Sequence, residues 1–211
     1  MPCGTIVGMS RPKNQEARRS QLITAAAKQL RESGAARVKL RDIAQEAEVT
    51  PASVLYYYPD VQDLFVEVFA RGANRYCAER ERRIGEAEGA VARLRACVAS
   101  GVVWPGTAEE TSRLLYELFP VALRDETAHS IQRDFFDRQA ALYEETLEQG
   151  AHTGEFTLAV PAPQLARTFL ALEDGYAMEV LVGGITAEEE ERRLLTFAQV
   201  VTGNEGLSPS A

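Results

Sequence analysis

The amino-acid sequence predicts an all-α fold of about nine helices. Apolar residues recur at the three- and four-residue spacing of one helix face along most of the 211 residues, and no segment shows the strict apolar–polar alternation of a half-buried strand. Glycine and proline residues interrupt this pattern at intervals that leave helix-length segments between them. With 45% of its residues apolar, the chain can form a packed core.

Each expected helix lies between two of these interruptions. The expected helices cover residues 14–33, 40–46, 51–57, 61–84, 87–103, 109–121, 125–150, 162–182 and 187–202. The interruptions are Gly34, the turn at 48–50, Pro59 with Asp60, Pro105 with Gly106, Pro120, the segment 150–154, Pro161 with Pro163, and Gly183 with Gly184. The helix at 61–84 carries an apolar face along four turns, which suits a connector packed between two domains.

Composition and motifs exclude several classes of protein. No apolar run reaches the roughly 18 residues of a membrane span, and residues 1–9 lack the charged start and long apolar core of a secretion signal, so we expect a cytoplasmic protein. The possible disulfide and metal residues are widely spaced: Cys3, Cys77, Cys97, His129 and His152. We therefore expect free thiols, no metal site and no cofactor. The sequence has no phosphate-binding loop and no G-x-S-x-G motif, so we expect no enzyme.

The charge of the chain is unevenly distributed. Its net charge is −8, which by itself argues against a nucleic-acid partner. Residues 1–60, however, carry nine basic and six acidic side chains, so this part holds +3 and the remainder holds −11. A basic end on an acidic body fits a protein that directs one end at phosphates, and the acidic body argues against nonspecific DNA binding.

Two short helices, at 40–46 and 51–57, are joined by a turn of three or four residues. This is the spacing of a helix-turn-helix, in which the second helix enters the major groove of DNA and the first braces it against the backbone. Thr50 suits the N-cap of the second helix, and Pro51 suits its first position. The sequence therefore predicts a DNA-binding unit near the N-terminus.

The residues of this unit carry a family pattern between Arg18 and Phe69. They are Arg41-Asp42-Ile43-Ala44, Ala47-x-Val49-Thr50, Ala52-Ser53-Val54, and Tyr58 six residues before Leu64. This stretch resembles the TetR family of transcriptional regulators, and Glu173-Asp174-Gly175-Tyr176 resembles a D-G-L segment of the same family. The resemblance implies an N-terminal three-helix DNA-binding domain and a C-terminal helical domain that binds a ligand and dimerises.

The resemblance and the pattern together divide the chain into four parts. We expect a flexible arm at 1–12, the helix-turn-helix domain at 13–60, the ligand-binding and dimerisation domain at 61–205 with the connector helix at 61–84, and a tail at 206–211. The Gly-, Ser- and Pro-rich residues from Gly203 onward are expected to fray.

The expected DNA contacts come from basic, small polar and tyrosine side chains around the second helix of the motif. They are Lys39, Arg41, Thr50, Pro51, Ala52, Ser53, Tyr56 and Tyr57. Tyrosine hydroxyls can donate to phosphate oxygens, which sets register rather than sequence, whereas Tyr58 is expected in the core. Two positions depart from the family: Leu55 replaces a frequent Tyr, and Val61 replaces a frequent Lys that contacts phosphate. The arm residues Arg11 and Lys13 could compensate for this loss.

The C-terminal part offers candidates for a ligand pocket, which is usually lined by aromatic side chains with a few polar groups. They are Trp104, Tyr116, Glu117, Phe119, Phe135, Phe136, Tyr143, Glu173, Asp174 and Tyr176. A carboxylate among aromatic rings favours a cation, so a hydrophobic cationic compound is a possible inducer. The alternative is that these acids face solvent or the dimer partner.

The last two helices offer a dimer interface, as the family resemblance implies. Their apolar stripes contain Leu165, Phe169, Leu172, Leu194, Phe197, Ala198 and Val201. Two such stripes on adjacent helices suit a four-helix contact between two copies of the chain. The alternative is that they complete the core of one monomer.

The sequence thus predicts a ligand-responsive, sequence-specific repressor that binds a double-stranded operator as a homodimer. A small-molecule inducer, aromatic or cationic and of a multidrug type, would release it. The alternative is a helical protein–protein interaction module with a weakened helix-turn-helix, which the loss of lysine at Val61 favours.

Overall fold

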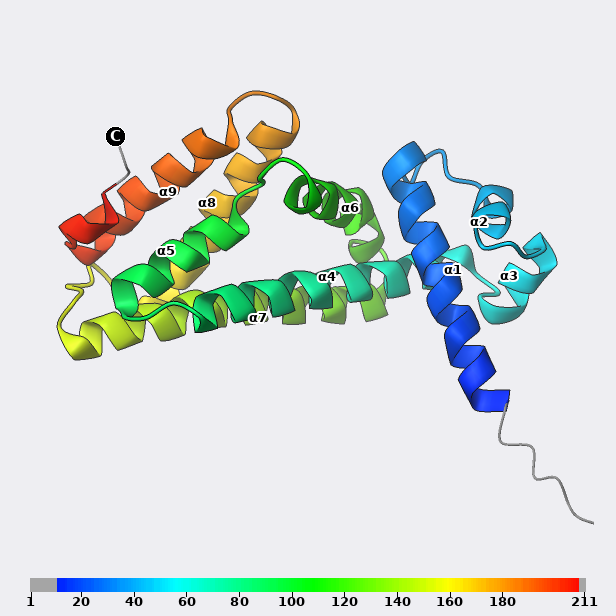
Figure 1. Ribbon diagram of the computed structural model, residues 1–211, viewed down its shortest axis with the longest axis horizontal. Coiled ribbons are helices and arrows are strands. Elements are labelled where there is room, and N and C mark those ends of the chain that lie inside the picture. Colours follow the sequence, from blue (N-terminus) through cyan, green and yellow to red (C-terminus); the bar gives the residue numbers. More distant parts are fainter. Residues whose placement is uncertain (1–10, 209–211) are drawn as a thin grey trace, which may run out of the picture.

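A computed structural model describes residues 11–208, and these form nine α-helices, one short 3-10 helix and no strand (Figure 1). The helices are α1 (Arg11–Ser33), α2 (Leu40–Glu46), α3 (Pro51–Tyr57), α4 (Val61–Gly85), α5 (Ala90–Gly101), α6 (Thr107–Ala122), α7 (Glu126–Thr153), α8 (Ala162–Leu181) and α9 (Ala187–Thr202). The expected all-α fold and number of helices are confirmed. Every helix in this part of the chain is too short or too polar to span a lipid bilayer.

The helices form a small head and a larger body joined by α4. Figure 1 shows α1, α2 and α3 gathered at one end of α4, which we call the head, while α5 to α9 form the body. α4 packs against α1 at the head and against α5, α6 and α7 in the body. The expected connector is therefore a single continuous helix that belongs to both parts.

The hydrophobic core of the head extends beyond its own three helices. Leu22, Ile43 and Val54 come from α1, α2 and α3 and are fully buried. The same cluster includes Leu64 and Phe69 of α4, and it also takes three leucines of α6: Leu114, Leu115 and Leu118. Burial of apolar area on both sides of residue 60 couples the head to α4 and α6.

One expected helix boundary, the end of α7, is wrong. α6 ends one residue beyond its expected bound and holds Pro120 in its last turn, where Leu118 and Ala122 are buried on either side of it. Gly150 lies inside α7, which continues to a left-handed C-cap at Gly154. A Cβ on Gly150 would come within 2.0 Å of the Phe156 ring, so glycine is needed here for close packing rather than for a turn.

The ends of the chain are more ordered than expected. Leu207 lies in a 3-10 helix (Glu205–Leu207) and is fully buried, and the Arg95 guanidinium donates to the Gly206 and Ser208 carbonyls. The prediction of a frayed tail is therefore wrong up to residue 208, because one buried apolar side chain and two carbonyl contacts hold this segment against α5. Residues 11 and 12 of the expected arm belong to α1, and residues 1–10, with Cys3, lie outside the described part.

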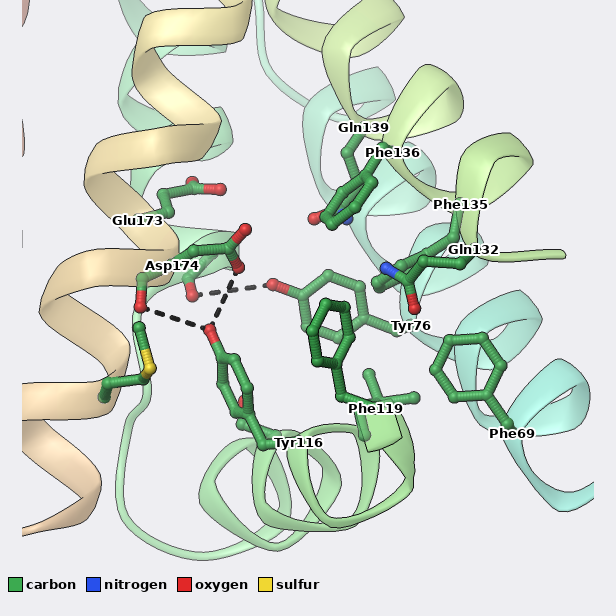
Figure 2. A pocket seen from close by; sticks show the side chains of 14 residues that line it. Phe69, Tyr76, Tyr116, Phe119, Gln132, Phe135, Phe136, Gln139, Glu173 and Asp174 are labelled. Carbon is green, nitrogen blue, oxygen red and sulfur yellow. Dashed lines mark hydrogen bonds between the residues drawn. The ribbon is translucent and has the colours of Figure 1, made fainter. Parts of the chain in front are cut away.

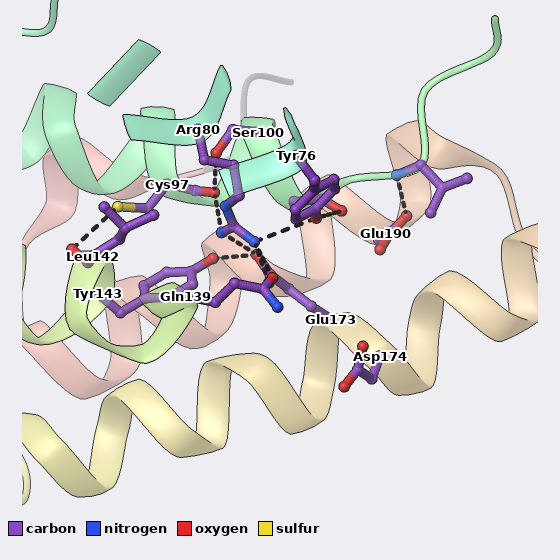
Figure 3. Close-up of polar contacts among 12 residues, drawn as sticks. Tyr76, Arg80, Cys97, Ser100, Gln139, Leu142, Tyr143, Glu173, Asp174 and Glu190 are labelled. Atoms are coloured by element: carbon purple, nitrogen blue, oxygen red, sulfur yellow. Dashed lines mark hydrogen bonds and ion pairs between the residues drawn. The ribbon is translucent and has the colours of Figure 1, made fainter. Parts of the chain in front are cut away.

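A buried ion pair occupies the centre of the body (Figure 3). The Arg80 guanidinium of α4 makes two 3.0 Å hydrogen bonds to the Glu173 carboxylate of α8, and Arg80 is 1% exposed. Arg80 also donates to Gln139 Oε1 on α7 and to the Cys97 carbonyl on α5, while the Tyr143 hydroxyl donates to Glu173. Four helices therefore meet at one charge pair.

Removing one partner of this pair should destabilise the fold more than replacing both partners. We expect Arg80→Met to lower the free energy of unfolding by about 3–5 kcal/mol, because it leaves Glu173 buried without a counter-charge. The double variant Arg80→Met with Glu173→Leu should be less destabilised than this single variant. Urea unfolding followed by circular dichroism measures both. Arg82→Met, which removes only exposed pairs, is the control and should cost less than about 1 kcal/mol. A double variant as unstable as the sum of two severe single variants would contradict this expectation.

A second buried carboxylate fastens α9 to the connection between α5 and α6. Glu190 is fully buried; its Oε2 accepts from the Val103 N–H at 3.1 Å, while its Oε1 has no protein partner in the described part. Burial raises the pKa of Glu190 from 4.5 to about 7, and the Val103 N–H only partly opposes this.

Glu190 should therefore make stability depend on pH. A carboxyl whose folded-state pKa is raised binds its proton more tightly in the folded state, so its contribution to stability is present below pH 4.5 and is lost as the pH rises to about 7. The loss is at most about 3 kcal/mol. We therefore expect the natural chain to lose stability relative to Glu190→Gln as the pH rises from 4.5 to 7.5. The measurement is the free energy of unfolding of both proteins at several pH values. Parallel pH profiles of the two proteins would exclude this role.

Candidate functional site

The head contains the two helices of the expected helix-turn-helix with the expected bounds. The chain reverses at Glu48, whose φ of 52° lies in the left-handed region. The Val49 N–H then donates to the Ala44 carbonyl over 2.9 Å. Thr50 Oγ1 accepts from the Ser53 N–H at 3.2 Å and caps α3, as its position in the sequence predicted.

The expected DNA-contacting residues lie on the outer face of this motif. Six of them are exposed and the other two, Ser53 and Tyr57, are half-buried; the exposed six are Lys39, Arg41, Thr50, Pro51, Ala52 and Tyr56. Tyr56 is 73% exposed, and its ring meets that of Tyr57 edge to face at 5.1 Å. α3 thus buries Val54 and presents small residues and two tyrosines outward.

Tyr58 has a structural role, as expected. It is buried, its hydroxyl donates to Glu67 of α4, and the Arg19 guanidinium of α1 lies 5.0 Å from its ring centroid. Burial, followed by the neighbouring Glu67 carboxylate, raises the pKa of Tyr58 far above its usual value. This residue ties the end of α3 to α1 and α4, and so fixes how α3 is presented.

The start of α4 is a poor place for a phosphate contact. Val61 is half-buried against the core of the head, where the family frequently has a lysine. Asp60 Oδ1 accepts from the Gln62 N–H at 2.8 Å, so a carboxylate already occupies this helix N-terminus. Two local features therefore remove the positive potential that a phosphate would meet there.

The body contains an aromatic cavity of about 200 Å³ (Figure 2). Its lining residues come from five helices: Phe69 and Tyr76 of α4, Gly101 of α5, Ser112, Leu115, Tyr116 and Phe119 of α6, Gln132, Phe135, Phe136 and Gln139 of α7, and Glu173, Asp174 and Met178 of α8. Figure 2 shows the rings gathered on one side and the two carboxylates on the other. This asymmetry gives the cavity an apolar wall and a polar wall.

The two carboxylates of the polar wall differ in charge balance. Glu173 is neutralised by Arg80, whereas Asp174 has no basic partner within residues 14–208 and accepts only from the Tyr116 hydroxyl at 2.9 Å. Burial raises the pKa of Asp174, and the Tyr116 hydrogen bond opposes that rise. Burial also raises the pKa of Tyr76 to about 12, so this ring stays neutral. With Asp174 ionised, the cavity carries one uncompensated negative charge.

Six of the expected pocket residues line this cavity: Tyr116, Phe119, Phe135, Phe136, Glu173 and Asp174. Four do not. Tyr143 is fully buried behind Glu173, and Glu117 points to the head, where it accepts from the Ala35 N–H at 2.6 Å. Tyr176 lies under the Arg193 guanidinium, and Trp104 lines a different hollow.

Sequence reasoning missed seven of the lining side chains: Phe69, Tyr76, Ser112, Leu115, Gln132, Gln139 and Met178. Phe69 and Tyr76 belong to the apolar face of the connector helix, which the sequence indicated only as a packing face. Gln132 and Gln139 are two turns apart on α7, on the same face as Phe135 and Phe136. Two amides at this spacing on an otherwise aromatic face were the signal that could have been found.

Most of the expected interface residues complete the core of the monomer. Leu165, Phe169, Leu194, Ala198 and Val201 are buried, while Leu172 and Phe197 are half-buried against the same cluster. These five side chains pack within one chain, which favours the alternative stated for them. The exposed apolar side chains of α8, of its C-cap and of α9 are Met178, Val182 and Val200.

The comparisons with known proteins agree on one family. The sequence model of bacterial regulatory proteins of the tetR family matches residues 22–68, and that of the C-terminal part of BetI-type transcriptional repressors matches residues 90–201. No curated protein sequence gives a significant match to the chain.

Solved structures share the fold at low sequence identity. A protein from Saccharomonospora viridis in complex with choline is 23% identical with a TM-score of 0.80, the match covering 87% of this chain and 96% of that one. A TetR transcription regulator from Haloarcula marismortui is 22% identical with a TM-score of 0.79, covering 89% of this chain and 99% of that one. Because one of these family models matches the head and the other matches the body, the chain belongs to the TetR family of transcriptional regulators.

Proposed function

We propose that the chain is a ligand-responsive, sequence-specific repressor that binds an operator as a homodimer and is released when a small organic cation enters the aromatic cavity. The observation that carries the proposal is Asp174, an uncompensated carboxylate facing aromatic rings in a cavity of the body. The proposal has a DNA part, a ligand part and a route between them.

The DNA part rests on the outer face of α3. The helix begins with small residues and ends with two tyrosines. The small residues let it approach the floor of a major groove, while the tyrosine hydroxyls reach phosphate. In a dimer, two such helices would meet successive major grooves about 34–36 Å apart. The described recognition helix holds no arginine, asparagine or glutamine, so DNA shape would contribute to specificity.

The DNA part predicts a cost for removing the two hydroxyls. We expect Tyr56→Phe with Tyr57→Phe to weaken operator binding at least about 30-fold, because each lost hydrogen bond to phosphate is worth about 1 kcal/mol and each protomer loses two. The measurement is fluorescence anisotropy on DNA from immediately upstream of the gene, with an unrelated duplex for comparison. Arg133→Gln, exposed on α7 of the body, is the control. Full-strength binding by the double variant would exclude the phosphate contacts.

The same titration separates the proposal from a second candidate, a helical interaction module with a weakened helix-turn-helix. Val61 and Asp60 favour that candidate, because together they remove a phosphate contact at the start of α4. Tight, salt-dependent binding to the upstream DNA alone supports the repressor. Equal, weak and salt-insensitive binding to both duplexes supports the interaction module.

The homodimer would use the outer faces of α8 and α9. Val200 of α9 is exposed there, and it lines a shallow hollow together with Tyr176 of α8 and Phe197 of α9. Apolar side chains exposed on two adjacent helices suit contact with the same face of a second copy. This surface replaces the buried stripe that the sequence indicated.

The ligand part rests on the pairing of one negative charge with several rings. A quaternary or tertiary ammonium group is attracted by the faces of aromatic rings and by a carboxylate, and it needs no hydrogen-bond acceptor for each of its faces. The structurally similar protein from Saccharomonospora viridis was determined with choline, which is such an ammonium compound. Gln132 Oε1, which is buried without a protein partner in the described part, adds a further acceptor to the cavity.

The route from cavity to head runs through neighbouring residues of α6. The Tyr116 hydroxyl donates to Asp174 in the cavity, and the next residue, Glu117, accepts from the Ala35 N–H in the head. A cation at Asp174 would compete with Tyr116 and shift α6, whose leucines are part of the core of the head. Release requires that the cation bind the shifted arrangement more tightly than the DNA-bound one.

The ligand part predicts that one substitution at Asp174 affects cation binding but not operator binding. We expect Asp174→Asn, which can still accept from Tyr116, to weaken the binding of choline or a larger ammonium compound about 10- to 100-fold while leaving operator affinity unchanged. Because burial raises the pKa of Asp174, cation affinity of the natural chain should also fall toward acidic pH, and the variant should lose this dependence. Calorimetry at several pH values measures both. Glu179→Gln, exposed on α8, is the control. Equal affinity of a cation for the natural chain and Asp174→Asn would remove Asp174 from the site.

A further inference from the structure

A second hollow, of about 600 Å³, lies between α4, α5 and the start of α6. It shares only Tyr76 with the aromatic cavity; Arg80 lines the hollow but not the cavity. Figure 3 shows Arg80, Tyr76 and Ser100 at one edge of the polar cluster and Asp174 at the other. The hollow therefore reaches the central ion pair from a side that the cationic ligand would not occupy.

The hollow is positively charged in a chain whose net charge is −8. Its lining includes Arg75, Arg82 and Arg83 of α4 against one acid, Glu79. Hydrogen bonds from Arg82 and Arg83 lower the pKa of Glu79 to about 2, and Arg82 also pairs with Glu86, so these two arginines are balanced by two acids. Arg75 makes no hydrogen bond or ion pair to any side chain within residues 14–208, so its guanidinium is available to a ligand.

Arg80 supplies a second unused donor. Its Nη atoms are engaged by Glu173, Gln139 and the Cys97 carbonyl, but its Nε is buried and has no hydrogen-bond partner in the described part. A buried N–H without an acceptor costs about 1–3 kcal/mol of stability, which a ligand oxygen would recover. This orphaned donor belongs to a side chain that lines the hollow.

The remaining lining is flat and apolar with a few hydroxyls. Trp104 is held in place because its Nε1 donates to the Ala99 carbonyl at 3.1 Å, so its ring forms a fixed wall. Ser100, Thr107 and Thr111 add hydroxyl groups at the same hollow. Guanidinium groups beside an indole ring match a carboxylate attached to a flat apolar body.

We propose that this hollow is a second ligand site, which takes an organic monoanion with a carboxylate on an aromatic or similarly flat body. Arg75 and the Nε of Arg80 would meet the carboxylate, and Trp104 would meet the ring. Because Arg75 and Arg80 belong to α4, such a ligand acts on the helix that joins the body to the head. The site does not depend on the ligand proposed for the aromatic cavity.

The test uses the full-length protein and benzoate, with the neutral benzamide as its near-isosteric control. Trp104 is the only tryptophan of the chain, so its fluorescence reports directly on the hollow, and calorimetry measures affinity independently. We expect a saturable change with benzoate and at least about tenfold weaker binding of benzamide. Equal binding of the two compounds, or no saturable response to benzoate, would overturn the proposal.

Matched variants locate the site. Arg75→Gln combined with Arg83→Gln should weaken benzoate binding at least about tenfold, since both side chains are exposed and the fold does not depend on them. Arg133→Gln, an exposed arginine on α7, should change nothing. Asp174→Asn should leave benzoate affinity unchanged even where it abolishes cation binding. Benzoate affinity that survives the arginine substitutions, or that is lost in Asp174→Asn, would move the anion out of this hollow and overturn the proposal.

Discussion

The ion pair between Arg80 and Glu173 is the interaction on which the rest of the body depends. Two charges removed from water must satisfy each other, and the pair does so by recruiting hydrogen bonds from α5 and α7 as well as from α4 and α8. It also dictates local sequence: a Cβ on Gly101 would come within 1.9 Å of the Glu173 carboxylate, so only glycine fits at that turn of α5. The relative positions of four helices follow from this one contact.

The same pair sets the electrostatics of the aromatic cavity. Glu173 and Asp174 are adjacent in sequence and both face the cavity, but Arg80 neutralises only the first. The second lies among aromatic rings without a basic partner, and a tyrosine hydroxyl is its only hydrogen-bond donor in the described part. The cavity thus differs from a simple acidic pocket: it combines one carboxylate without a basic partner and a large aromatic surface, which is why we propose a small organic cation as its ligand.

The head and the body are mechanically continuous. Three leucines of α6 and the first turns of α4 complete the core of the head, and Glu117 adds a direct hydrogen bond to its backbone. A change in the cavity that moves α6 must therefore repack or displace the head, because packed interfaces switch between discrete arrangements rather than deform smoothly. Because Tyr116 and Glu117 are neighbours on α6, the proposed route from the cavity to the head is short.

The sequence by itself determined the elements and the DNA-binding motif. Periodicity, the Thr50 cap and the glycine breaks are local signals, so the bounds of α2, α3 and α9 and the buried role of Tyr58 could be predicted from neighbouring residues alone. Only the tertiary structure decided which apolar faces meet. Phe169 and Leu194 carry the same helical pattern whether they face a second copy or their own core, and Tyr143 and Tyr116 are equally aromatic. The continuation of α7 through Gly150 and the burial of Leu207 likewise depend on distant partners, because burial is a property of what packs against a residue and not of the residue itself.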